Sequence, residues 1–119
     1  MYGLPAGFDG SRLVGRTLEQ VSFTTNTIHF SFDDDVSITL ESSLLHSRPG
    51  EPADSGRMRV PVRDSRLMQL VGMAVRSVDG SSDGTLSLTF TNDHRVSFFD
   101  DRPEYEAYCI RVGRDVIVV

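Results

Sequence analysis

Lysine and tryptophan are absent from this chain of 119 residues, and cysteine occurs once, at Cys109. All 12 basic residues are therefore arginines, which excludes a lysine Schiff base, a catalytic lysine amine and the lysine of a phosphate-binding loop. A lone cysteine excludes an intramolecular disulfide and a metal cage of thiolates. Because arginine codons are GC-rich and lysine codons AT-rich, the bias also indicates a bacterial genome of high GC content.

Long apolar runs are absent as well. No stretch approaches the roughly 20 residues of a membrane-spanning helix, and the first residues lack the basic start and apolar middle of a signal peptide. The net charge of −5 favours solubility and argues against general affinity for nucleic acid. We therefore expect a cytoplasmic protein of one domain, residues 1–119, with no membrane partner, no nucleic-acid partner and no cofactor.

The sequence does contain a duplicated pattern, at about residues 13–41 and 70–101. Leu70-Val71-Gly72 follows Leu13-Val14-Gly15 at a spacing of 57 residues (70 minus 13), and the spacing becomes 58 in the hairpins (86 minus 28). The corresponding apolar residues are Leu18, Val21, Ile28, Phe30, Phe32, Ile38 and Leu40 in the first copy and Val75, Val78, Leu86, Leu88, Phe90, Val96 and Phe98 in the second.

Each copy predicts a strand followed by a β-hairpin. Apolar and polar residues alternate through each hairpin, which is the pattern of strands with one buried face. Asp34-Asp35 and Asn92-Asp93 lie where the chain must turn, and both residue types tolerate the positive φ of tight turns. In the strand before each hairpin the apolar residues are three apart, so we expect a β-bulge there in both copies. We also expect Phe32 and Phe90 in the core, and Thr27, Ser31, Ser87 and Thr89 on the solvent face.

The segments outside the repeats predict a loop, an edge strand, a helix and two final strands. The polar residues 47–56 predict a mobile loop, and Pro61 within residues 57–62 is typical of an edge strand. Residues 64–71 predict a helix capped by Asp64 or Ser65, with Leu67, Leu70 and Val71 buried. Residues 105–112 and 116–119 predict paired strands. The last is apolar and β-branched, so we expect it inside the sheet, covered by the N-terminal segment, or paired with a partner.

These patterns predict a mainly β fold, an antiparallel sheet built from two repeated strand–hairpin units with one or two short helices. The alternative is an α+β roll in which the helix at residues 64–71 crosses one sheet.

The sequence contains several residues of catalytic types, but none lies in the surroundings that catalysis requires. Ser82 lies in a G-x-S-x-G sequence, but strand, turn and strand surround it instead of the strand-to-helix turn that presents a nucleophile. Glu104 and Glu106 belong to an ordinary two-faced strand, and we interpret Cys109 as a small hydrophobe on a sheet face. We therefore expect no enzyme.

The three histidines, His29, His46 and His94, are separated in the sequence and lack metal-ligand spacing. His94 follows Asp93, which would raise the pKa of its ring.

Two charged groups remain as possible partner or anion contacts. Arginines concentrate between residues 48 and 66, and two of them share one strand face, where they could grip a phosphate or carboxylate. The acidic run at the first hairpin turn could meet a basic partner. The candidate residues are Arg57, Arg59, Arg63, Asp33, Asp34 and Asp35.

The pattern L-V-G-x-x-[LV]-x-x-V, followed by an alternating run into F-x-[ND]-D and by E-x-Y, resembles small actinobacterial proteins of unknown function. It is carried by residues 13–40, 70–98 and 104–108, and the resemblance supplies no catalytic residues. By size and class the chain is also similar to immunity proteins of bacterial toxin systems, which cover a toxin's active site. We favour a non-enzymatic interaction module, with a homodimer or another protein partner covering a strand edge. The alternative is a small-ligand-binding or hydrolytic enzyme with a site between the repeats, which a pocket of at least three convergent polar side chains would favour.

Overall fold

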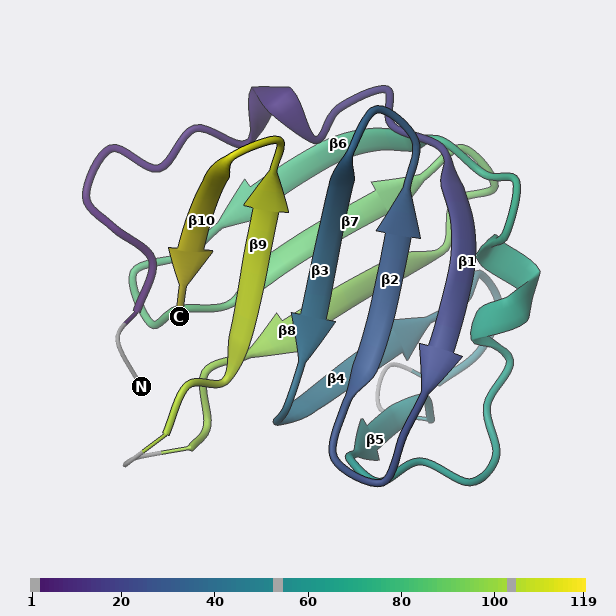
Figure 1. Cartoon of the computed structure of the whole chain (residues 1–119). Helices are drawn as coiled ribbons and strands as arrows, with labels where there is room; N and C mark the ends of the chain where they lie inside the picture. Colours follow the sequence, from purple (N-terminus) through teal and green to yellow (C-terminus); the bar gives the residue numbers. More distant parts are fainter. Residues whose placement is uncertain (1–2, 53–54, 103–104) are drawn as a thin grey trace.

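The two repeats form two three-stranded meanders, one in each of two sheets that pack face to face (Figure 1). The computed structural model describes residues 3–52, 55–102 and 105–119. Both sheets are antiparallel and five-stranded, and their strands cross at a steep angle (Figure 1). In spatial order, the first contains β1 (Leu18–Phe23), β2 (Ile28–Phe32), β3 (Val36–Leu40), β9 (Tyr108–Val112) and β10 (Asp115–Val118). The second contains β5 (Arg57–Arg59), β4 (Ser43–Ser47), β8 (Arg95–Phe99), β7 (Leu86–Phe90) and β6 (Val75–Gly80).

The predicted mainly β class, the hairpins and both β-bulges are confirmed. The register of β1 against β2 shifts between Leu18 and Gln20, and that of β6 against β7 shifts between Val75 and Ser77. These positions correspond in the two repeats. The bulge lets apolar residues three apart share the buried face, as the spacing in the sequence requires.

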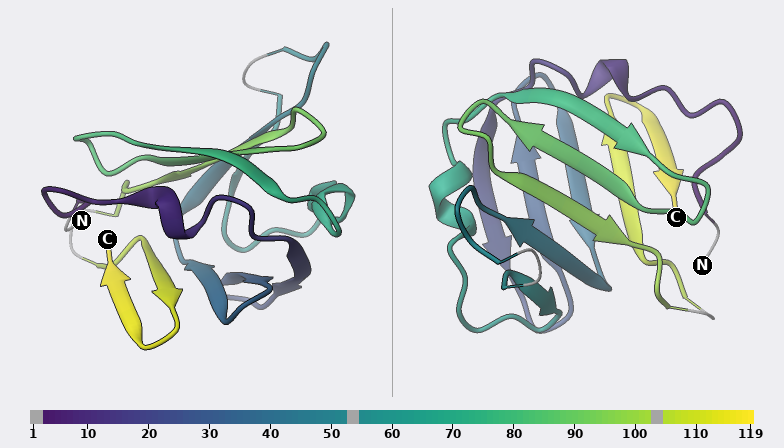
Figure 2. Two further views of the ribbon diagram at one scale, coloured as in Figure 1. Left: turned by 90° about the horizontal axis from the view of Figure 1, so that it is seen from above. Right: turned by 180° about the vertical axis from the view of Figure 1, so that it is seen from behind.

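Each repeat contributes its next strand to the sheet of the other repeat. β4 follows the first repeat but pairs with β8, the last strand of the second repeat's meander. β9 follows the second repeat and pairs with β3, at the equivalent place in the first meander. The back view in Figure 2 shows β4 beside β8 in one layer. The duplication thus extends beyond the residues in which it is visible as sequence.

The repeats also meet through glycines that both copies need. Gly15 donates its N–H to the carbonyl of Val75 at 2.8 Å, and Gly72 donates to the carbonyl of Leu18 at 2.7 Å. The two glycines have φ of +85° and +90°, a conformation that residues with a Cβ rarely adopt. The glycine of each Leu-Val-Gly motif is therefore required where the backbone of one repeat bonds to that of the other.

The core between the sheets consists of the apolar faces that the alternation predicts. Phe32 and Phe90 are buried, as expected, and the rings of Phe30 and Phe98 meet edge to face with centroids 5.2 Å apart. The buried Tyr108 adds a polar contact, because its hydroxyl donates to the carbonyl of Gly84 at 2.6 Å. Such a bond removes most of the cost of burying a phenol.

The expected helix at residues 64–71 is wrong. Only a single 3-10 turn, η2 (Leu67–Leu70), forms there, and the Leu67 N–H bonds to the Ser65 hydroxyl at 3.3 Å. Leu67 and Leu70 are buried, but Val71 is already extended and exposed. With the other 3-10 turn at η1 (Gly10–Arg12), the described residues contain no α-helix, which excludes the α+β roll.

Two further findings differ from the expectations. The strands are divided between two sheets, whereas we described a single sheet. β4 occupies residues 43–47, for which we predicted no strand, so Ser47, the first residue of the expected loop at 47–56, is the last residue of this strand. The ends of the loop are tied by the His46 N–H, which donates to the Gly56 carbonyl at 3.0 Å. Residues 53–54 lie outside the described part, and the loop's mobility stays a prediction.

The last strand is not inside its sheet. β10 pairs with β9 alone and forms the sheet's outer edge. The N-terminal segment runs along this side of the sandwich, between the edges formed by β6 and β10 (Figure 2). Arg12 in η1 bonds to Asp115 at 2.6 Å, which fixes the segment beside the start of β10. In the second sheet β5 is an edge strand, as predicted, and β6 forms the opposite edge.

Candidate functional site

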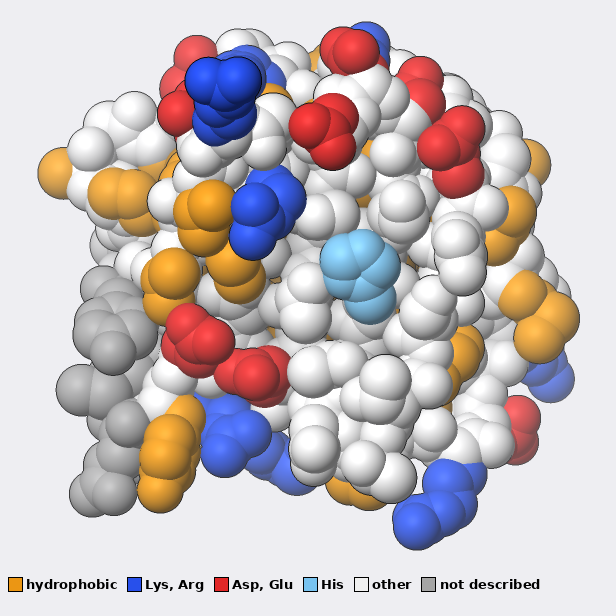
Figure 3. All heavy atoms as spheres, in the orientation of Figure 1, with side chains coloured by type: hydrophobic (Ala, Val, Ile, Leu, Met, Phe, Trp, Pro, Cys, Tyr) orange, Lys and Arg blue, Asp and Glu red, His pale blue; other side chains and the backbone are white. Residues whose placement is uncertain are grey.

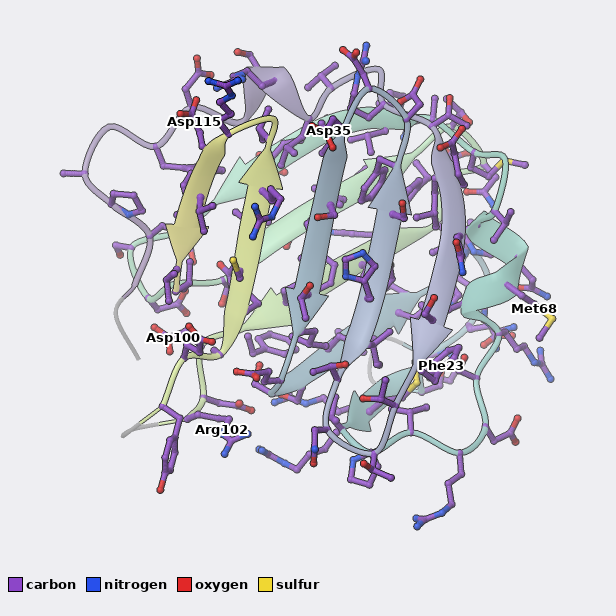
Figure 4. All side chains as sticks on the ribbon, in the orientation of Figure 1. Phe23, Asp35, Met68, Asp100, Arg102 and Asp115 are labelled. Atoms are coloured by element: carbon purple, nitrogen blue, oxygen red, sulfur yellow. The ribbon has the colours of Figure 1, made fainter. Side chains whose placement is uncertain are left out.

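The six candidate residues from the sequence do not form one site. Arg57 and Arg59 lie on β5, whereas the acidic run forms the turn between β2 and β3 (Figure 4, where Asp35 is labelled). Arg63 lies in the segment between β5 and η2. It lines a separate hollow of about 310 Å³ together with Phe23 and Met68.

The acidic run is largely occupied by contacts within the chain. Asp33 accepts the Thr17 N–H at 2.9 Å, and Asp34 pairs with Arg16 at 2.9 Å. Asp34 and Asp35 have φ of 58° and 61°, which confirms the turn that the sequence predicts. These aspartates therefore have a structural explanation.

Arg57 and Arg59 share one face of β5, as predicted, and both approach Asp101. The Asp101 Oδ2 atom lies 2.9 Å from Arg59 and 3.8 Å from Arg57, and it accepts the Ser43 hydroxyl. Its Oδ1 atom is buried and has no hydrogen-bond partner within the described residues. The Arg57 guanidinium also lies 4.1 Å above the Phe99 ring, which orients it by a cation–π contact.

A polar pocket of about 280 Å³ opens beside Arg57, between the end of β4, β5 and the segment before η2. Glu51 lies close to two of its arginines, at 2.5 Å from Arg48 and 4.0 Å from Arg66. The lining residues are His46, Arg48, Ser55, Gly56, Arg57, Met58, Asp64, Ser65 and Arg66.

Sequence reasoning missed the contact of His46 with His94. The Nε2 atom of His46 lies 2.9 Å from the Nδ1 atom of His94, so one ring donates to the other. Their proximity follows from the pairing of β4 with β8, in which His46 lies opposite Val96, two residues after His94. The sequence did contain one signal: Leu44 and His46 are two residues apart, as residues on one face of a strand are. It would have placed His46 on a buried face if residues 43–47 had been predicted as a strand.

Both histidines favour the neutral form. The pKa of His46 is lowered to about 4, chiefly by burial and then by the neighbouring His94 and Arg48, against an opposing effect of Glu51. Burial also lowers the pKa of His94, with Arg48 as the next cause. The expected increase from Asp93 is wrong, because Asp93 pairs with Arg76 at 2.5 Å.

The second candidate surface is the edge of β10. Val116 and Val118 are 46% and 38% exposed, on the outer face of the first sheet. Figure 3 shows this face, with hydrophobic side chains over β9 and β10 and a histidine near the centre. Cys109 lies on this face, in register with Val118, and burial raises the pKa of its thiol. That supports its interpretation as a small hydrophobe.

A family model matches residues 10–119, and its description is "Family of unknown function (DUF6188)". The chain belongs to the DUF6188 family. No curated protein and no solved structure matches it. No helix in the part of this DUF6188 chain that the structure describes has the length and apolar character to cross a membrane.

Among the described residues no three His, Cys, Asp or Glu side chains gather as metal ligands, so the histidine pair lacks a third. Ser82 lies in the exposed turn between β6 and β7, and Glu104 of the carboxylate pair lies outside the described residues. Two features remain as candidates for binding: the arginines around the pocket and the edge strand β10 with its exposed valines.

Proposed function

We propose that this DUF6188 protein is a non-enzymatic interaction module that forms a homodimer through the edge of β10. The observation that carries the proposal is the combination of an unpaired strand edge with exposed apolar side chains, Val116 and Val118. Native edge strands are usually defended by charge, proline or a covering segment, because an open edge invites pairing with another chain.

The backbone register shows which groups a partner would meet. Val119 and Tyr108 exchange hydrogen bonds, with the Val119 N–H to Tyr108 carbonyl distance at 2.9 Å. Because backbone groups alternate in direction, the N–H and C=O groups of Val116 and Val118 point away from β9. Within the described residues they have no backbone partner.

A second copy fits this edge, because a two-fold axis presents the same strand to itself in antiparallel orientation. Ile117 would lie opposite its symmetry mate, and Val116 of one copy opposite Val118 of the other. Opposed β-branched side chains favour such pairing. The nearest acidic side chain, Asp115, is bound by Arg12 at 2.6 Å and brings little repulsion to the edge.

Sedimentation at micromolar concentrations tests the proposal. The wild-type protein should be a dimer, and the double variant Val116→Lys/Val118→Lys should be a monomer, because like charges would then oppose each other across the interface. The matched control is Val14→Lys/Val71→Lys, since both of these valines are 43% exposed elsewhere on the surface. A wild-type monomer, or dimers in the β10 variant, would refute the proposal.

An immunity-type role in the bacterial cytoplasm is the alternative use of the same edge, supported by small size and the exposed β10. A toxin would then pair with β10 in place of the second copy. Binding of a toxin encoded beside this protein's gene, abolished by Val116→Lys/Val118→Lys, would identify that role, whereas binding that survives the variant would exclude it.

A further inference from the structure

We infer that the pocket beside Arg57 binds an oxyanion, the phosphate or carboxylate group of a small ligand. The inference concerns a different surface from the β10 edge and does not depend on dimer formation. The observation behind it is that two arginines of the pocket, Arg48 and Arg66, approach the same group, Glu51, in a protein whose net charge is −5.

The geometry already accommodates a carboxylate. Glu51 lies between Arg48 and Arg66, at 2.5 and 4.0 Å, so two guanidinium groups converge on one oxyanion of the chain itself. A ligand's oxyanion would take the place of Glu51. The Glu51 side chain is 34% exposed and belongs to the connection between β4 and β5, so it can leave without disturbing the core.

Arg57 borders the pocket, but its guanidinium lies 4.1 Å above the Phe99 ring and 3.8 Å from Asp101, on the face of β5 that it shares with Arg59. The charged donors of the pocket are therefore Arg48 and Arg66. Arginine presents several N–H donors in a rigid plane, which suits the oxygens of phosphates and carboxylates. The Ser65 hydroxyl, which accepts the Leu67 N–H, keeps its own hydrogen for a ligand.

The backbone of the pocket is closely packed at Gly56. A Cβ at this position would lie 1.9 Å from the carbonyl oxygen of His46, so a larger residue would displace the wall. The pocket therefore keeps its shape through a residue that sequence reasoning assigned only to a loop.

The electrostatic field of the pocket provides a readout. His46 lies in the pocket wall beside His94, with Arg48, Arg57 and Arg66 as the cations and Glu51 and Asp64 as the anions around it. An anion that replaces Glu51 beside Arg48 takes over the favourable effect that Glu51 now has on protonation of His46, and it changes the surroundings of the His46 ring. The NMR signals of the His46 ring should therefore shift when the ligand binds.

The experiment is an NMR titration of the full chain with inorganic phosphate and, separately, with acetate at constant ionic strength. We expect saturable shifts of the His46 ring signals. Saturation by phosphate alone identifies a phosphate site, by acetate alone a carboxylate site, and by both a general oxyanion site. No saturation by either anion overturns the inference.

Three variants localise the site. Arg66→Gln should weaken binding by about tenfold, and Glu51→Gln should strengthen it by about tenfold, because one removes a charged donor and the other the internal competitor. The control is Arg76→Gln, since Arg76 is also largely exposed (52% against 64% for Arg66) and lies in β6, at the opposite edge of the sheet from β5. Wild-type affinity in Arg66→Gln, or an equal loss in Arg76→Gln, would overturn the inference, provided that both variants keep the wild-type spectrum elsewhere.

Discussion

Thr17 and Ala74 pair in an isolated antiparallel β-bridge at the junction of the two repeats. They occupy corresponding positions, 57 residues apart (74 minus 17), and each accepts an N–H from its own repeat's hairpin. Asp33 donates to the Thr17 carbonyl and Thr91 to the Ala74 carbonyl, both at 3.0 Å. The bridge therefore lies at a local pseudo-two-fold axis that relates the two repeats of the chain.

The junction glycines should tolerate substitution poorly for a backbone reason alone. Nothing lies within 4 Å of a Cβ built at Gly15 or Gly72, but φ is +85° and +90°. Gly72→Ala should therefore lower the free energy of unfolding by about 1–2 kcal/mol, measured by urea denaturation. Gly72→Asn should cost less, because asparagine tolerates positive φ. Equal costs for alanine and asparagine would contradict this explanation.

Phe90 should be a core anchor. It is 1% exposed, so Phe90→Ala should lower the free energy of unfolding by about 3–5 kcal/mol in a urea titration. Phe23 is the control, because it is 45% exposed and Phe23→Ala should cost less than about 1 kcal/mol. A loss below about 1 kcal/mol for Phe90→Ala would contradict the assigned sheet face.

The hydroxyls of Ser87 and Ser97 should behave as a coupled pair. Both residues are buried, at 5% and 8% exposure, with their oxygens 2.8 Å apart, although we expected Ser87 to face solvent. Ser87→Ala should cost about 1–2 kcal/mol because it leaves the Ser97 hydroxyl without its partner. The double variant Ser87→Ala/Ser97→Ala should cost less than the sum of the single losses. Additive losses in denaturation experiments would show that the pair is not coupled.

The histidine pair should make stability depend on pH. The pKa of His46 is lowered to about 4 in the folded protein, whereas an unfolded histidine titrates near its ordinary value of 6.5. Between these two pH values the His46 ring binds a proton in the unfolded chain but not in the folded protein. The contribution of His46 to the free energy of unfolding is therefore fully present above pH 6.5 and decreases as the pH falls toward 4.

We expect His46 to contribute roughly 1–2 kcal/mol to this loss, less than the full pKa difference implies, because electrostatic effects at buried sites are weaker than a dry interior would give. Urea denaturation at several pH values, compared between the wild type and His46→Gln, isolates the contribution from that of the carboxylates. Identical pH profiles for the two proteins would contradict the prediction.

The local parts of this fold could be predicted from the sequence, whereas the parts that depend on pairing between distant segments could not. The alternation around Phe30 and Leu88 identified the hairpins, and the spacing of Leu18 and Val21 identified a bulge. These signals lie within a few residues of one another. Ser65 was predicted to cap a helix, but the turn begins only at Leu67 and the chain is extended again at Val71, where it enters the junction with the other repeat.

The candidate site shows the same division. Arg57 and Arg59 were found because they share one short strand. His46 and His94 were not connected, because their contact depends on the pairing of β4 with β8. The adjacent Leu44 and Leu45 obscured the alternation of β4, since Leu45 is half-buried on the outer face.

The reciprocal placement of β4 and β9 has a consequence for how the chain folds. Neither half can complete its own sheet, because the fourth strand of each sheet comes from the other half. The pairing of β3 with β9 brings Ile38 to Ile110, which requires closure of a loop longer than half the chain. We therefore expect a single cooperative unfolding transition, and slow folding in the millisecond-to-second range that is typical of β proteins with distant pairings. Separate fragments for each repeat should remain unfolded alone and acquire structure only when they are mixed.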